Sequence, residues 1–221
     1  MSDATNFRIA EDLESLSEIQ KSQFKGVIME GLQGKFTQTL PDDTESILKI
    51  IDIWVKYDFL PMDETFCVID ETNGDVLAIL LLNNYKKPNT RQSIDCLRSV
   101  IKAIGFKKAM KIAFNFLELD NLNKEENTDR IAGEIYLVST RTDLRGKGIG
   151  TLIMNAAIKA IRSKIQNKPG DVIKLLVFEK NPALHLYEHL GFTRINSVPT
   201  PKMAKAFGGD YDVLIRMEKP L

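Results

Sequence analysis

The sequence predicts an α/β fold, and three patterns in its 221 residues carry that prediction. Two apolar segments, 65–70 and 76–82, flank an Asn73-Gly74 dipeptide, which is typical of a β-hairpin turn. Apolar residues recur at helical spacing in several other stretches. A glycine-rich turn, 145–150, joins an apolar strand to an amphipathic helix. With 43% hydrophobic residues, the chain is long enough to bury a core as one domain, residues 1–221.

The first half of the chain begins with a short strand expected over residues 6–10. A helix expected over residues 11–32 follows, and Gly31 and Gly34 should end it. The segment Pro41-Asp42-Asp43-Thr44 is a start signal for a second helix, expected to run as far as Leu60-Pro61. The hairpin comes directly after it.

A helical insertion is expected at about residues 86–130, because about fifty residues separate the hairpin from the next strand and a compact connection needs far fewer. Ile94, Leu97, Ile101 and Ile104 share one helical face, and Gly105 interrupts the pattern. Residues 86–117 are strongly basic. The basic residues are Lys86, Lys87, Arg91, Arg98, Lys102, Lys107, Lys108 and Lys111, against Asp95 alone. The first interpretation of this basic segment is a helical layer whose charged side chains are solvated. The alternatives are a lid over the acceptor, a homodimer surface, or a patch that binds an anionic partner or a membrane.

The glycine-rich turn has the chemistry of an anion site. It comprises Arg145, Gly146, Lys147, Gly148, Ile149, Gly150 and Thr151. Its glycines allow a ligand close to the backbone, the helix that begins there leaves its first N–H groups unpaired, and Arg145 and Lys147 add positive charge. The G-x-G-x-G spacing matches neither a Walker A loop nor a dinucleotide-binding fingerprint.

The C-terminal part predicts a strand at 172–178, a short helix at 181–192 ending in glycine, a strand at 193–197, a loop at 198–210 and a last strand at 211–217. Here Asn181, Ala183, Tyr187, Gly191 and Phe192 form the pattern N-x-A-x-x-x-Y-x-x-x-G-F. Together with Arg145, Gly148 and Gly150, in the pattern R-x-x-G-x-G, this resembles the two motifs of the GNAT superfamily of acyl-CoA-dependent N-acetyltransferases. The resemblance covers residues 134–192.

The resemblance implies a mixed, mostly antiparallel central sheet flanked by helices, with the insertion before the fourth strand. It also implies an enzyme that transfers the acetyl group of acetyl-CoA directly to a primary amine of a small molecule or peptide. A different acyl donor, a hydroxyl acceptor, or a CoA-binding sensor without turnover are the alternatives. The identity of the acceptor cannot be inferred from the sequence.

The resemblance also implies roles for individual residues. Glu134, on the strand before the turn, is the expected general base, and Tyr187 the general acid that protonates or hydrogen-bonds the leaving thiolate. For Glu134 the alternative is a solvent-facing or ion-paired strand residue, and for Tyr187 a packing role. Strand alternation should place Glu134 and Tyr136 on one face with Val138 and Thr140, unless a bulge shifts the phase.

The remaining cofactor contacts are expected from the main chain and one side chain. Main-chain groups of Val138, Ser139 and Thr140 should pair with the pantetheine amides like an added strand, and the Val138 N–H should stabilise the oxyanion. Asn181 binds the cofactor arm or caps its helix.

Other chemistries are weakly supported. The net charge is zero, which argues against general affinity for nucleic acid. His185 and His189 lack a third ligand, so we expect no metal, and Cys67 and Cys96 suit small apolar roles. Neither a signal peptide nor a membrane-spanning segment is expected, which predicts a cytoplasmic protein.

Overall fold

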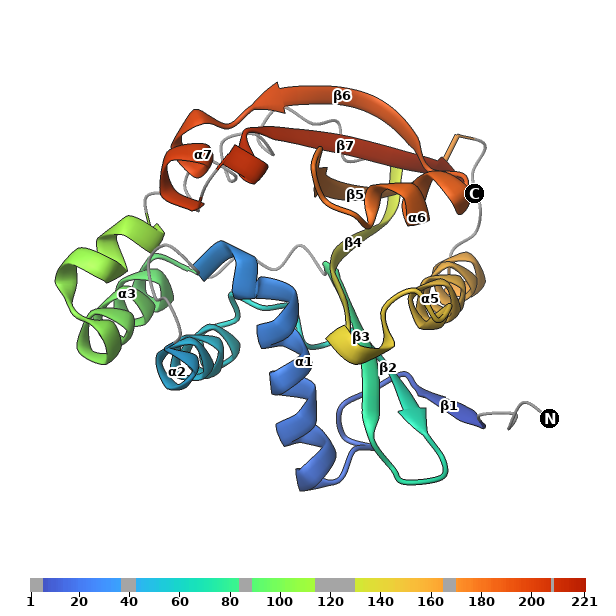
Figure 1. The fold of residues 1–221 in the computed structure, drawn as a ribbon, viewed down its shortest axis with the longest axis horizontal. Coiled ribbons are helices and arrows are strands. Elements are labelled where there is room, and N and C mark those ends of the chain that lie inside the picture. The colour runs from blue at the N-terminus through green and yellow to red at the C-terminus, as the bar shows by residue number, and fades with distance from the viewer. Residues whose placement is uncertain (1–5, 37–42, 84–88, 114–129, 165–169, 208) are drawn as a thin grey trace.

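The computed structural model describes residues 6–36, 43–83, 89–113, 130–164, 170–207 and 209–221. Within them the strands form one sheet in the order β1-β2-β3-β4-β5-β7-β6 (Figure 1). The strands are β1 (Phe7–Ala10), β2 (Thr65–Asp70), β3 (Val76–Asn83), β4 (Ile131–Thr140), β5 (Val172–Phe178), β6 (Thr193–Pro199) and β7 (Val213–Pro220). Neighbouring strands are antiparallel except β4 and β5, which are parallel. The expected mixed, mostly antiparallel sheet is confirmed.

Helices cover both faces of the sheet (Figure 1). On one face lie α1 (Glu18–Phe36), α2 (Thr44–Lys56), α3 (Thr90–Ile104) and a helix over residues 106–113. On the other face lies α5 (Ile149–Lys164). Two apolar cores result, and each stabilises the sheet from one side by burying apolar surface. Phe24, Ile51 and Ile79 belong to the α1 core, and Leu80 and Ile153 to the α5 core.

The first helix differs from its predicted bounds at both ends. It begins at Glu18 because Ser17 and Gln20 cap it reciprocally: Ser17 Oγ accepts from the Gln20 N–H at 3.3 Å, and Gln20 Oε1 accepts from the Ser17 N–H at 3.0 Å. It runs through Gly31 to Phe36. A Cβ at Gly31 would lie 2.8 Å from the Cβ of Ser139 on β4, so this glycine permits close packing and does not end the helix.

The other predicted elements are placed well, with two corrections. Asp43 caps α2 as expected, with its side chain accepting from the Ser46 N–H, but α2 ends at Lys56 and the left-handed Asp58 follows. The stretch predicted as a loop at 198–210 contains α7 (Pro201–Phe207). Its Met203 is fully buried against Phe178 and Leu214, so tertiary packing stabilises a helix that local spacing does not reveal.

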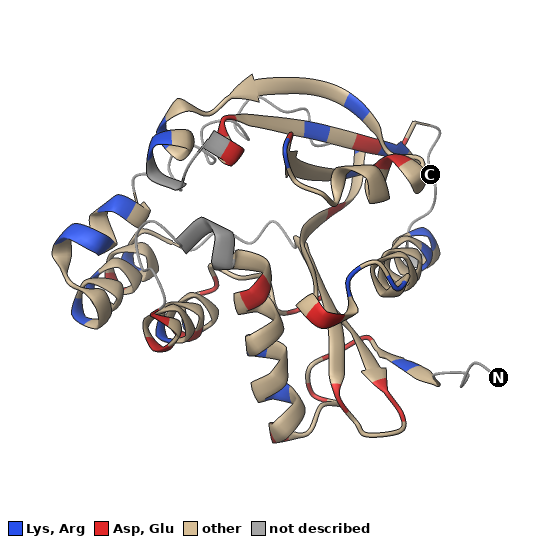
Figure 2. Cartoon of the chain, viewed as in Figure 1, with Lys and Arg blue, Asp and Glu red and all other residues tan. Residues whose placement is uncertain are grey.

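The insertion contains helices as predicted, over 90–104 and 106–113, with Gly105 between them at φ +83°. Cys96, Val100, Ala109 and Ile112 bury their side chains in the α1 core. The described basic residues of the insertion are exposed, and Figure 2 colours their positions blue on these helices. These are Arg91, Arg98, Lys102, Lys107, Lys108 and Lys111. Lys86, Lys87 and the acidic segment 118–129 lie outside the described residues.

A β-bulge interrupts β4. Its pairing with β3 shifts between Leu137 and Ile135, which leaves Tyr136 as the extra residue. Ile135 packs in the α5 core, so Glu134 points to the α1 face; Leu137 belongs to the α1 core and Val138 packs against the α5 core. The predicted alternation therefore holds only up to Tyr136. Beyond the bulge, Val138 and Thr140 do not share the face of Glu134.

Candidate active site

Strands β4 and β5 form a fork. They pair from Ile131 to Ile135 on β4 and from Val172 to Leu175 on β5, and the pairing ends there although both strands continue. The Arg141 N–H donates to the Leu77 carbonyl of β3 at 2.9 Å. Because hydrogen-bonded pairs alternate along an antiparallel ladder, Leu137 and Ser139 also bond β3. The main-chain N–H and C=O groups of Val138 and Thr140 therefore point to the open edge of β4.

The glycine turn lies at the mouth of this fork. Gly146 and Gly148 have φ of +77° and +82°, and a Cβ at Gly148 would have no atom within 4 Å, so the backbone here is both left-handed and open. The Leu152 N–H donates to the Gly148 carbonyl at 3.0 Å. The N–H groups of residues 149–151 precede this bond and have no carbonyl within α5, which leaves them available to an anion.

Two residues of the turn itself, Arg145 and Lys147, are exposed cations. Arg145 reaches back so that its Nε donates to the Thr140 carbonyl at 3.4 Å, while Lys147 is exposed. The guanidinium of Arg145 thus lies against the open edge of β4. The open backbone, the free helix start and the two cations together fit a pyrophosphate group.

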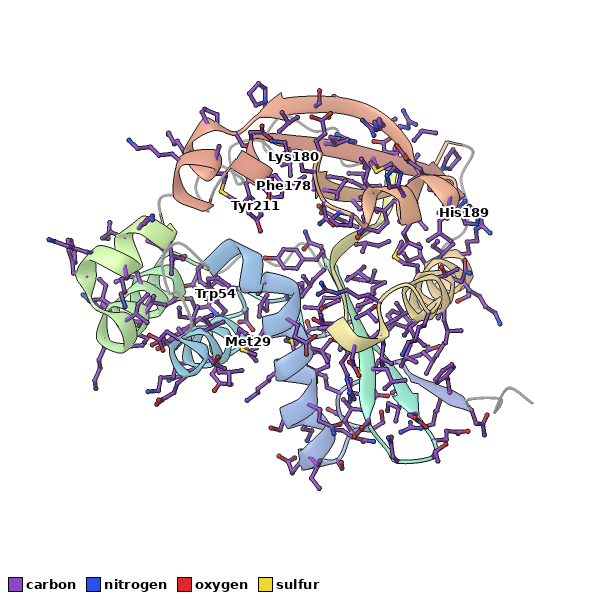
Figure 3. All side chains as sticks on the ribbon, viewed as in Figure 1. Met29, Trp54, Phe178, Lys180, His189 and Tyr211 are labelled. Carbon is purple, nitrogen blue, oxygen red and sulfur yellow. The ribbon has the colours of Figure 1, made fainter. Side chains whose placement is uncertain are left out.

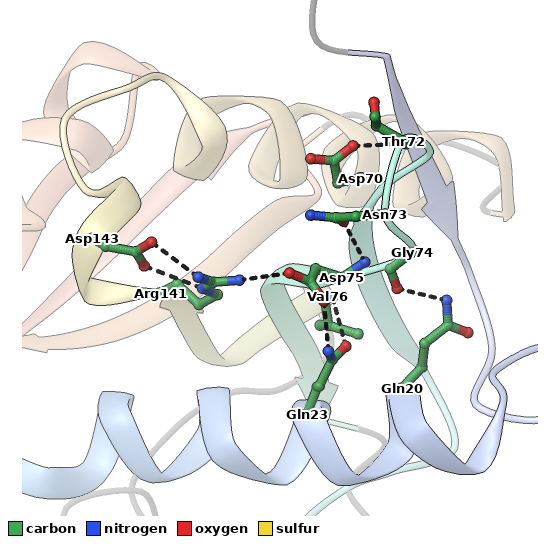
Figure 4. A network of polar contacts seen from close by, with 10 residues as sticks. All are labelled: Gln20, Gln23, Asp70, Thr72, Asn73, Gly74, Asp75, Val76, Arg141 and Asp143. Carbon is green, nitrogen blue, oxygen red and sulfur yellow. Dashed lines mark hydrogen bonds and ion pairs between the residues drawn. The ribbon is translucent and has the colours of Figure 1, made fainter.

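Polar contacts with distant elements stabilise residues 141–144, the segment that leads into the turn, as Figure 4 shows. Arg141 bonds Asp143 at 2.9 Å and Asp75 of the hairpin at 3.3 Å. The hydrogen bond to Asp143 raises the pKa of Arg141 and lowers that of Asp143. On the α1 side, Glu30 accepts from both the N–H and the hydroxyl of Thr142, at 2.6 and 2.9 Å. The sequence gives no local signal for these contacts.

Glu134 lies at the closed end of the fork. Its side chain is buried, with 6% of the residue exposed, and it points to the α1 face of the sheet. Asn83 of β3 donates from Nδ2 to Glu134 Oε2 at 2.8 Å, and Lys174 of β5 places Nζ 3.4 Å from Oε1. The sequence offered two alternatives to a general base for Glu134. A solvent-facing side chain is wrong because Glu134 is buried, whereas an ion-paired side chain is present. Sequence analysis missed Asn83 and Lys174.

Tyr187 lies on α6 (Leu184–His189), which follows the other arm of the fork. Its ring is buried in the α5 core, edge-to-face with Phe192 at 6.2 Å between centroids. This burial raises the pKa of Tyr187 to about 12. A Cβ at Gly150 would lie 3.2 Å from Leu186 Cδ2, so α6 packs directly against the start of α5. The packing role therefore applies to the ring, and the hydroxyl stays a neutral phenol at ordinary pH.

Two of the expected cofactor contacts have local roles. Asn181 Oδ1 accepts from the Ala183 N–H at 2.9 Å in a turn just before α6; the N-cap of α6 is Ala183, so this contact is not the helix cap that the sequence offered as an alternative. The buried hydroxyl of Ser139 faces Gly31 and has no hydrogen-bond partner among the described residues. Both the side chain and the main chain of Ser139 thus point away from the open edge of β4.

Other reactive groups lie away from the fork. Cys67 and Cys96 are buried and free, and burial raises their pKa values to about 12 and about 11. His185 and His189 are exposed; Figure 3 labels His189 at the outer end of α6. The described residues contain no group of three His, Cys, Asp or Glu side chains that suits a metal ion. Nor does any helix within the described ranges have the length and hydrophobicity to cross a bilayer.

Residues 111–194 match the acetyltransferase (GNAT) domain family. The mycothiol acetyltransferase of Corynebacterium jeikeium is 26% identical over 86 residues, which cover 39% of this chain. The matched part is 24% of that relative, so this chain spans about a quarter of its length.

Solved structures share the fold at low identity. Histone acetyltransferase HPA2 and related acetyltransferase from Corynebacterium glutamicum has a TM-score of 0.57 at 15% identity, covering 97% of this chain and 96% of that one. A mutant of agmatine N-acetyltransferase in its apo form has a TM-score of 0.58 at 13% identity, covering 98% and 100%. The NatC complex bound to Gag peptide and CoA gives 0.53 at 16% identity, covering 98% and 99%.

Proposed function

We propose that this chain is an acetyltransferase of the GNAT family, which uses acetyl-CoA, and that it transfers the acetyl group directly to a primary amine, in one domain formed by residues 1–221. One observation carries the proposal. The fork combines an open main-chain edge at Val138 and Thr140, a glycine turn at its mouth and a buried carboxylate, Glu134, at its closed end.

Acetyl-CoA fits the fork through groups of this chain. The N–H groups of residues 149–151, with Arg145 and Lys147, would hold the pyrophosphate, and Gly148 leaves room for it. The N–H and C=O groups of Val138 and Thr140 would pair with the pantetheine amides as an added strand does. The Val138 N–H would also stabilise the oxyanion, because a donor fixed before the reaction needs no reorganisation.

Glu134 is the proposed general base. An ordinary carboxylate and an ordinary amine differ by about six pH units in pKa, so full proton transfer before attack is uphill by about 8 kcal/mol. The nitrogen becomes far more acidic as it bonds to the carbonyl carbon. Only the neutral amine has a lone pair for attack, so the ammonium form first loses one proton to solvent. Glu134 then takes the second proton from the nitrogen as it bonds to the carbonyl carbon, directly or through a water molecule.

Tyr187 is proposed to stabilise the departing thiolate. With a pKa of about 12, its phenol is a much weaker acid than an ordinary thiol, whose pKa is about 8.5. Full proton transfer to the thiolate is thus unfavourable by about 5 kcal/mol. A hydrogen bond from the neutral hydroxyl needs no such transfer. The burial of Tyr187 therefore favours the hydrogen-bonding role over the role of proton donor.

Calorimetry with acetyl-CoA tests the cofactor site. Gly148→Glu places a side chain and a negative charge where the pyrophosphate would lie, and we expect it to abolish the binding that the wild type shows. Gly105→Glu is the matched control, because Gly105 has nearly the same φ, +83° against +82°, and is equally open, but lies in the insertion. Equal loss in both variants would indicate backbone strain alone, and no binding to the wild type would refute the proposal.

An amine panel then tests turnover, with Glu134→Gln as the inactive comparison. The panel spans peptide N-termini, lysines, polyamines, aminoglycosides and arylalkylamines, because the sequence leaves all of them open. Binding of acetyl-CoA with no turnover on any of them would favour the CoA-binding sensor. Transfer to a hydroxyl, or faster transfer of another acyl group, would favour the corresponding enzyme alternative.

A further inference from the structure

Lys174 is a cation that lies inside the sheet. It stands in the middle of the apolar strand β5 and only 2% of it is exposed. Its register partner on β4 is Glu134, and its register partner on β7 is Glu218. Burial of an ammonium group is strongly unfavourable unless an opposite charge compensates it. The Glu134 carboxylate, 3.4 Å from Nζ, supplies that charge.

The charge of Lys174 also affects the Glu134 carboxylate, and this effect bears on the proposed reaction. A buried carboxylate without a partner binds a proton, and a protonated glutamate cannot act as a base. A cation within about 4 to 6 Å favours the charged form. The Asn83 amide can only donate to Oε2, so this contact favours the same form. Each carboxylate oxygen keeps a second lone pair for the acceptor or for a water molecule.

We propose that Lys174 is a positioning residue for acetyl transfer, which holds Glu134 ionised and in place at the closed end of the fork. The proposal rests on the function proposed above. Lys174 touches neither the acceptor nor the cofactor in this scheme and acts through Glu134. Its place in the fold supports this, because β4 and β5 stop pairing one residue beyond Glu134 and Lys174, at Ile135 and Leu175.

The other charged groups near the pair are accounted for on each neighbouring element. On β7, the Glu218 carboxylate is bonded to Arg216. On β3, the group facing Glu134 is the uncharged Asn83. On α1, which packs against β4, Glu30 is bound to Thr142 at the far end of the strand. Among the residues that the structure describes, Lys174 is thus the charged group that lies against Glu134.

The pH dependence of kcat/KM tests the proposal. In Lys174→Met we expect the acidic limb to move up by about one to three pH units, with activity largely recovered at high pH, because Glu134 then ionises only in more basic solution. Lys174→Arg keeps the charge and should leave the limb close to its wild-type position. Lys49→Met is the matched control, because it removes an exposed ion pair with Glu45. It should change neither the position of the acidic limb nor the activity.

A loss of activity in Lys174→Met that is equal at all pH values would overturn the proposal, since it would indicate a structural role only. A second measurement is independent of turnover: carbon-13 NMR of the Glu134 carboxyl in the apo protein. We expect it to be ionised at neutral pH in the wild type, and to bind a proton at a pH about one to three units higher in Lys174→Met than in the wild type. A protonated Glu134 in the wild type would overturn the proposal even if the variant fails to fold. Absence of wild-type turnover would refute the enzyme function without deciding the NMR result.

Discussion

Tyr187→Phe should make the protein more resistant to alkaline unfolding. The substitution keeps the ring that packs in the α5 core and removes only the hydroxyl. Burial raises the pKa of Tyr187 to about 12 in the folded protein, against about 10 in an unfolded chain. The folded state therefore retains this proton at pH values where the unfolded state loses it. The stability that depends on Tyr187 is fully present below pH 10 and is lost as the pH rises through 12.

The size of the effect follows from these two values. Each unit of difference in pKa corresponds to 1.36 kcal/mol, so the wild type should lose about 1 kcal/mol relative to the variant at pH 11. The difference should level off at about 3 kcal/mol well above pH 12. Cys67 and Cys96 also have raised pKa values, but both proteins contain them, so their contribution cancels in the comparison.

Urea unfolding of the two proteins at several pH values from 8 to 11 measures this difference. The curves should run parallel up to about pH 10 and then separate, with Tyr187→Phe the more stable protein. Curves that stay parallel to pH 11 would show that the phenol is solvated in the folded protein. The argument that Tyr187 donates a hydrogen bond to the thiolate, and not its proton, would then lose its basis.

Two further predictions concern the packing around the site. Gly31→Ala should lower the free energy of unfolding by about 1 to 3 kcal/mol, because its Cβ would lie 2.8 Å from both Cβ and Oγ of Ser139, and the better helix propensity of alanine offsets only about 1 kcal/mol. Adding Ser139→Gly should restore most of that loss in urea titrations; a stable Gly31→Ala protein would contradict the close contact. Cys67 and Cys96, with pKa values of about 12 and about 11, should react slowly with a thiol reagent at pH 8 and quickly after denaturation in urea, whereas rapid reaction of the native protein would show that the thiols are accessible.

The parts of the fold that sequence analysis predicted well are those specified by local chemistry. Asn73-Gly74 set the hairpin turn, and Asp43 set the start of α2. The errors occur where contacts between distant segments determine the local structure. Gly31 is predicted to end a helix, but in the structure it permits a close contact with β4. The helix α7 was missed because burial of Met203 stabilises it, and burial cannot be read from seven residues of sequence.

The candidate site divides in the same way. The resemblance to the GNAT motifs predicts Glu134, Tyr187 and the glycine turn as site residues. The partners of Glu134 lie on other strands and reach it through sheet register, which the sequence does not give. The sequence nevertheless indicates that Lys174 has a charged partner, because a lysine inside the apolar run Val172–Phe178 requires a compensating charge on a neighbouring strand. This position therefore predicts a carboxylate partner, but it does not identify which residue supplies the carboxylate.

The bulge at Tyr136 connects these features. A bulge bends its strand and increases the local twist, and here it occurs directly after Ile135, the last residue of β4 that pairs with β5. One extra residue therefore accounts for the opening of the fork. It also sends the Val138 side chain into the α5 core while its main chain faces the open edge. Substitutions that keep Val138 apolar should therefore spare the reaction, because the proposed oxyanion contact belongs to the backbone and the side chain serves only to anchor the strand.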